Sequence, residues 1–102
     1  MIDLNFLPSF EADAIEIWSH VADEDPSAAD RLIERIYLRC LILQEHPGAG
    51  QRRPEVADDC RQLVVSPVLV LYRHHGNQVD LVRAIYRGRN VTPDMFSGGG
   101  RS

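Results

Sequence analysis

Arginine is the residue type in this chain that offers the clearest chemistry. All 11 basic residues are arginine, and lysine is absent. The planar guanidinium group binds carboxylates and phosphates in a bidentate manner. Five arginines lie in or next to three short apolar runs in the second half of the chain: Arg61, Arg73, Arg83, Arg87 and Arg89. Gathered on one surface beside Tyr86, such arginines would form a patch that binds a phosphate or an acidic protein segment.

Arg83 has two readings, because it stands among Val, Leu and Ile in its apolar run. A buried guanidinium without a partner is costly, so Arg83 must either pair with a carboxylate or reach an open face. Asp80, Asp58 and Asp59 are the partners that we consider for an ion pair. In the other reading, Arg83 belongs to the anion-binding patch.

The charge of the chain is polarised. The net charge is −4, but residues 1–60 hold 13 acidic and 5 basic side chains, whereas residues 61–102 hold 2 acidic and 6 basic ones. Proteins that bind ribosomal RNA carry cation-rich surfaces throughout. A local basic patch on an acidic chain favours one acidic peptide over a ribosome.

The elements that must position these residues follow from the apolar pattern. Alternation and β-branched runs predict strands at Ile2–Phe6, Gln62–Ser66, Val68–Arg73 and Val79–Tyr86. Apolar residues at helical spacing predict helices over residues 9–23 and 26–45, the second capped by Asp25 and started by Pro26. The order β-α-α-β-β-β predicts an α+β fold: a helical hairpin packs on one face of a small, mostly antiparallel sheet and leaves the other face partly open.

The remaining features of the sequence limit the domain organisation, the possible cofactors and the expected location. Residues 1–90 are expected to form a single domain, and residues 91–102, which include Gly98-Gly99-Gly100, a flexible tail. Cysteine and histidine are not spaced as metal ligands and no Gly-rich phosphate loop follows a strand, so neither a metal nor a cofactor is expected. Cys40 and Cys60 are predicted to be reduced thiols, because neither a signal peptide nor a membrane span is recognisable and the expected location is cytoplasmic.

Four segments together carry a family resemblance: LPSFEADAIEIWSHVADEDPSAADRLIERI, HPGAGQRRPE, CRQLVVSPVLVLYR and VDLVRAIYRGRN. Their order and spacing resemble the ParE branch of the RelE/ParE toxin superfamily. The resemblance implies the toxin of a type II toxin–antitoxin module, neutralised by a ParD-like antitoxin that wraps around it. It also implies DNA gyrase as the target, since toxins of the ParE branch poison gyrase.

At three positions the sequence departs from the family pattern, which leaves alternative functions open. Val68 replaces a usual aromatic residue, Tyr86 replaces a usual histidine, and Asn90 stands near a usual aspartate. Tyr86 with Arg61 and Arg83 would suit phosphodiester cleavage, as in the RelE branch, which cuts messenger RNA on the ribosome. A toxin that only binds its antitoxin is a third reading.

The arginines and Tyr86 are in any case the residues expected to bind the target or the antitoxin. Apolar area left on an open sheet face predicts a homodimer or a toxin–antitoxin hetero-oligomer.

Overall fold

A computed structural model of the chain describes residues 1–88 and 91–99. One sheet contains strands in the order β1-β5-β4-β3-β2, with bounds Asp3–Phe6 (β1), Gln51–Arg52 (β2), Cys60–Val65 (β3), Val68–His75 (β4) and Gln78–Tyr86 (β5). The helices are α1 (Pro8–Ala22), α2 (Pro26–Cys40), the 3₁₀ helix η1 (Leu41–Gln44) and α3 (Pro93–Gly99). Among the strands of this described part, only β1 pairs in parallel, with β5. The predicted α+β class and mostly antiparallel sheet are confirmed.

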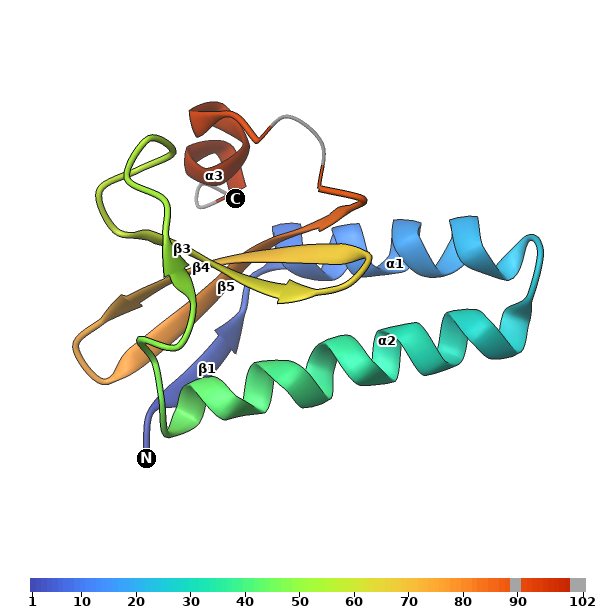
Figure 1. Cartoon of the computed structure of the whole chain (residues 1–102), viewed down its shortest axis with the longest axis horizontal. Helices are drawn as coiled ribbons and strands as arrows, with labels where there is room; N and C mark the ends of the chain where they lie inside the picture. The colour runs from blue at the N-terminus through green and yellow to red at the C-terminus, as the bar shows by residue number, and fades with distance from the viewer. Residues whose placement is uncertain (89–90, 100–102) are drawn as a thin grey trace.

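Helices α1 and α2 form the predicted hairpin on one face of the sheet (Figure 1). Asp25 has an extended backbone, and its carboxylate accepts a hydrogen bond of 3.1 Å from the Ala28 amide, while Pro26 occupies the first turn. This cap begins α2 where the sequence predicts it. Phe10 and Ile36 are fully buried between the hairpin and the sheet, so the apolar stripes of both helices hold the two layers together.

Strand β5 contains a β-bulge that alternation does not predict. Its pairing with β4 shifts register between Leu71 and Tyr72, which leaves Val82 without a residue opposite. A bulge of this kind moves the following side chains to the other face. Val82 therefore packs away from the hairpin and Ala84 packs toward it. Strict alternation, which puts Val82 and Ala84 on one face, is wrong here.

The second face of the sheet is covered in part, and Val64 on this face remains 54% exposed, so the predicted partly open face is retained at the β3 edge. Helix α3 lies over this face, opposite α2 (Figure 1). A second buried cluster forms under it from Val56, Cys60, Leu71, Val82, Ile85 and Phe96. Residues 91–102 were expected to form a flexible tail, but residues 93–99 are helical, because Phe96 can bury its ring to 2% exposure. Residues 100–102 lie outside the described part.

Cys40 and Cys60 are buried free thiols, as the sequence predicts. They belong to the two different clusters and so lie on opposite faces of the sheet. Burial raises the pKa of Cys40 to about 12 and that of Cys60 to about 11. Both groups are therefore protonated at neutral pH and pack as small apolar side chains.

The described residues lack two further features. None of their helices has the length and apolar character that a bilayer crossing requires. Within the same ranges, His, Cys, Asp and Glu form no group of three or more that could hold a metal ion.

Candidate target and antitoxin surfaces

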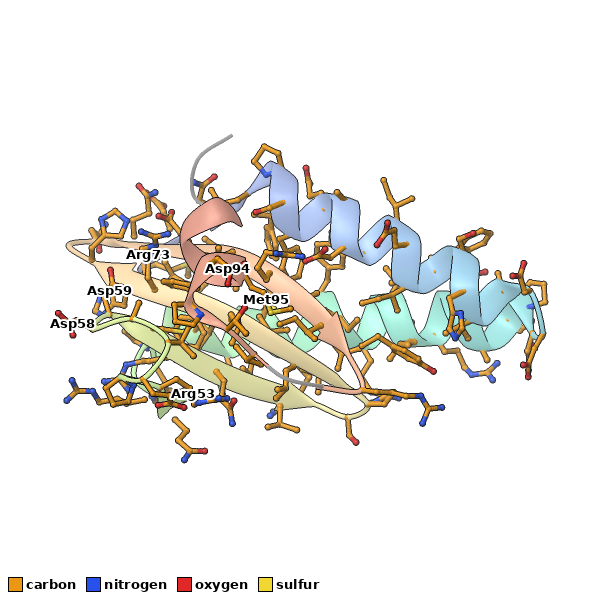
Figure 2. All side chains as sticks on the ribbon, turned by 90° about the horizontal axis from the view of Figure 1, so that it is seen from above. Arg53, Asp58, Asp59, Arg73, Asp94 and Met95 are labelled. Carbon is orange, nitrogen blue, oxygen red and sulfur yellow. The ribbon has the colours of Figure 1, made fainter. Side chains whose placement is uncertain are left out.

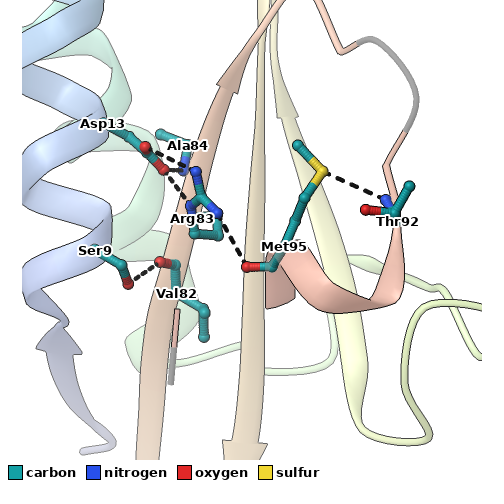
Figure 3. Close-up of polar contacts among 7 residues, drawn as sticks. All are labelled: Ser9, Asp13, Val82, Arg83, Ala84, Thr92 and Met95. Carbon is teal, nitrogen blue, oxygen red and sulfur yellow. Dashed lines mark hydrogen bonds and ion pairs between the residues drawn. The ribbon is translucent and has the colours of Figure 1, made fainter. Parts of the chain in front are cut away.

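Arg83 is held by a carboxylate on α1. Its Nε lies 2.7 Å from Asp13 Oδ2 and its Nη2 lies 3.1 Å from Asp13 Oδ1 (Figure 3). The same carboxylate accepts a 2.9 Å bond from the Ala84 amide, and Arg83 Nη1 donates to the Met95 carbonyl at 3.1 Å. Hydrogen bonding to Asp13 raises the pKa of Arg83, despite the opposing effect of burial. Arg83 thus joins α1, β5 and α3, and its partner is none of the aspartates considered from the sequence.

A cleft of about 490 Å³ opens beside this ion pair, where the end of β5 meets α1 and α3. Glu16 and His20 line it from α1, and Tyr86 and Arg87 line it from the end of β5. The Tyr86 ring packs edge-on against His20, with ring centres 5.3 Å apart, and the Arg87 guanidinium lies 5.1 Å from the Tyr86 ring centre. Arg87 adopts a φ of 61°, which turns the chain away from the sheet at this point. The cleft thus presents a phenol, an imidazole and a guanidinium together.

The other predicted arginines lie elsewhere. Arg61 is at the opposite end of the sheet from Tyr86, because Arg61 pairs with Tyr72 whereas Tyr86 pairs with Val68. Its Nη1 donates to the carbonyls of Gly48 and Gly50, at 3.2 and 2.8 Å. The structure therefore does not bring Arg61 to Arg83 and Tyr86, as the ribonuclease reading requires. Arg89 lies outside the described residues.

Arg73 lies beneath α3 and contacts other residues of the chain rather than an open surface. Its guanidinium stacks on the Phe96 ring, 4.8 Å from the ring centre, and its Nε is 4.0 Å from Asp80 Oδ2 (Figure 2 shows Arg73 beside α3). That buried Nε makes no hydrogen bond among the described residues. Burial tends to raise the pKa of Asp80, but hydrogen bonds from Gln78, His75 and Asn5 outweigh it and lower the pKa overall. Arg73 and Asp80 therefore stabilise the β4–β5 hairpin under α3.

An apolar groove of about 460 Å³ runs between α1 and α2 on the outer side of the hairpin. Ile15 and Trp18 line one wall and are 69% and 40% exposed, and Ile33 and Tyr37 line the other. The indole of Trp18 donates a 2.8 Å hydrogen bond to Asp30, which holds the ring at the edge of the groove. Its helical spacing from Phe10 and Ile17 predicts Trp18 to be a core residue, but its ring lies at the edge of the groove.

Sequence and structure comparisons place this fold in a family. Residues 4–91 match the profile of the family described as "ParE toxin of type II toxin-antitoxin system, parDE". The chain belongs to the ParE toxin family. The resemblance seen in the sequence is confirmed over nearly the whole chain.

A solved structure supports the fold of this ParE family member. It is described as "Chromosomal ParDE TA system from P. aeruginosa"; the two chains are 22% identical, with a TM-score of 0.76. The match covers 86% of this chain and 98% of that one. No curated protein matches the chain.

The cleft and the groove are thus concave surfaces, formed by described residues, that a partner of this ParE family member could contact. The sequence predicts Tyr86 and Arg87 of the cleft as binding residues, but it does not single out Glu16 and His20. Ile15 was missed as well. The signal for Ile15 was available: it is a large apolar residue one position outside the buried stripe of its helix.

Proposed function

We propose that this chain is the toxin of a type II toxin–antitoxin module, that it inhibits DNA gyrase, and that a ParD-like antitoxin neutralises it. The observation that carries this proposal is the match to the ParE toxin family over residues 4–91. Gyrase as the target follows the activity that the ParE resemblance implies. The net charge of −4 fits a protein target better than ribosomal RNA.

The placement of the arginines does not support messenger RNA cleavage by the residues expected for it, Arg61, Arg83 and Tyr86. Phosphodiester cleavage needs a proton-transferring group and a cation around one phosphate. Arg61 is bonded to loop carbonyls at the far end of the sheet, and Arg83 is engaged by Asp13. Of the arginines and tyrosine expected from the sequence, the half-buried Tyr86 and the exposed Arg87 line the cleft together with exposed Glu16 and His20, and such a mixed surface suits protein binding. We therefore assign the cleft to the target.

The groove between α1 and α2 is the surface that we assign to the antitoxin. Exposed Ile15 and Trp18 leave apolar area in contact with water, and an amphipathic helix can cover such a groove. Glu11 at its rim could pair with a basic residue of that helix. The antitoxin would then occupy the hairpin, away from most of the cleft.

Gyrase inhibition is expected in a supercoiling assay with the purified chain. Arg87→Glu should weaken inhibition by about tenfold or more, because it reverses a charge at the mouth of the cleft. Arg52→Glu changes the net charge equally at a distant exposed site and should leave inhibition unchanged. Supercoiling that stays intact at saturating wild-type chain would remove the gyrase proposal, and it would favour a toxin that only binds its antitoxin. Cleaved transcripts in a translating extract would favour the ribonuclease instead.

Antitoxin binding is expected to depend on the groove. The probe is a ParD-like antitoxin, titrated by calorimetry. Ile15→Asp should weaken binding by about tenfold or more, because it places a charge in an apolar contact. Leu38→Asp changes an exposed leucine on the outer side of α2 and serves as the control. Equal loss of affinity in both variants, or none in either, would show that the antitoxin binds elsewhere.

A further inference from the structure

The outer edge of β3 is only partly paired. Strand β2 pairs with Gln62 and Arg61 alone, so no described strand lies beside residues 63–65 on that side. The Cys60 carbonyl points outward, since it accepts a 2.9 Å bond from the Arg53 amide. Backbone groups of alternate residues point to the same side of a strand, so the N–H and C=O of Val64 also face outward. Figure 2 shows β3 as the yellow-green border of the sheet beyond Arg53.

A row of arginines on α2 flanks this edge. Arg35 Nη2 donates to the Ser66 carbonyl at the end of β3, which places this side of the helix against the edge. Arg31 and Arg39 lie four residues before and after Arg35, so the three share one side of α2. All three are exposed, and none forms an ion pair with another described residue. The edge therefore has unneutralised positive charge on the hairpin side of the sheet.

The other side of the same edge is apolar. The Val64 side chain points away from the hairpin and is 54% exposed. It borders a hollow of about 400 Å³ that Pro67 and Leu69 also line. An unpaired strand edge, cationic on one side and apolar on the other, is a template for an added strand of matching character.

We propose that this edge binds an extended acidic segment of a partner protein, which adds a sixth strand beside β3. The residue of that segment opposite Val64 shares its face and is apolar. The residues on either side of it turn toward α2, and their carboxylates pair with Arg35 and Arg39. This surface lies on the opposite side of α2 from the groove, and the proposal depends on neither the gyrase target nor the antitoxin helix.

Hydrogen exchange measured by NMR tests the added strand directly. The probe is a blocked peptide of about six residues that alternates glutamate and valine. Saturating peptide should slow exchange of the Val64 amide by about tenfold or more, because that amide gains a backbone partner. The Leu4 amide, on the opposite edge strand β1, should not change. The same peptide with lysine in place of glutamate should give no protection.

A charge variant tests the arginine row. Arg39→Glu should weaken peptide binding by about tenfold, because it removes one attraction and adds a repulsion. Leu41→Glu adds a negative charge to η1, after α2 and away from the edge, and should change affinity by no more than about twofold. An unchanged Val64 amide, or equal binding of the lysine peptide, would overturn the proposal. Val64 protection that grows with protein concentration in the absence of peptide would also overturn it, because a second copy of the chain would then occupy the edge.

Discussion

Asp13→Ala is expected to lower the free energy of unfolding by about 2 kcal/mol, less than the cost of breaking a fully buried ion pair, because this pair is partly exposed. Asp13 and Arg83 are only 12% and 25% exposed, and the carboxylate accepts three hydrogen bonds, two from Arg83 and one from the Ala84 amide (Figure 3). Its removal leaves a guanidinium with the Met95 carbonyl as its remaining partner among the described residues. Urea denaturation measures the loss.

A double-mutant cycle separates the ion pair from other effects of the change. Arg83→Met alone should also destabilise, because it leaves the Asp13 charge without its partner, whereas the double variant should recover part of the loss. Glu16→Ala, one turn further along α1 in the same cleft, is the control and should change stability by no more than about 0.5 kcal/mol. Additive losses in the double variant would show that Asp13 and Arg83 are not coupled.

Gly50→Ala is expected to cost about 2–3 kcal/mol, because overpacking a tight site forces its neighbours to move. A Cβ at Gly50 would lie 2.5 Å from the Gln62 carbonyl oxygen and 2.6 Å from the Tyr72 ring. Neither neighbour can give way easily. Tyr72 is fully buried, and its hydroxyl accepts from the Gly50 amide and donates to the Pro47 carbonyl, both at 2.8 Å.

Gly48 provides the matched control for Gly50, two residues away in the same loop. A Cβ at Gly48 meets nothing within 4 Å. Gly48→Ala should therefore be neutral or slightly stabilising, since alanine restricts the unfolded chain more than glycine does. Thermal unfolding of both variants measures the contrast. Equal melting temperatures would mean that the loop shifts to accept the Cβ and that Tyr72 does not anchor it.

Local patterns were enough to predict the hairpin and the main strands. The Asp25-Pro26 cap places the start of α2, and the apolar stripes of α1 and α2, which include Phe10 and Ile36 respectively, identify the faces that pack on the sheet. The end of α2 was less well predicted, because the last turn tightens into the 3₁₀ helix η1 rather than continuing as α-helix. Capping and periodicity depend on residues within a few positions of one another, so one sequence contains that information.

Which residues form the cleft and the open edge could not be predicted locally, because it depends on contacts between residues far apart in the chain. The bulge turns Val82 toward the sheet face under α3, and Phe96 packs on that same face. Neither has a local signal, because both depend on how β5 pairs with β4 and how α3 packs.

The arginines show the same division between sequence and structure. Residue types alone require that Arg83 either pairs with a carboxylate or reaches an open face, since a buried guanidinium cannot stay unpaired. The packing of α1 against β5 selects the first of these and supplies Asp13, 70 positions away, as the partner. It also separated Arg61 from Tyr86, because strand register and not sequence distance sets which side chains meet. Residue types thus fix which interactions are required, and the packing of distant elements decides which residues supply them.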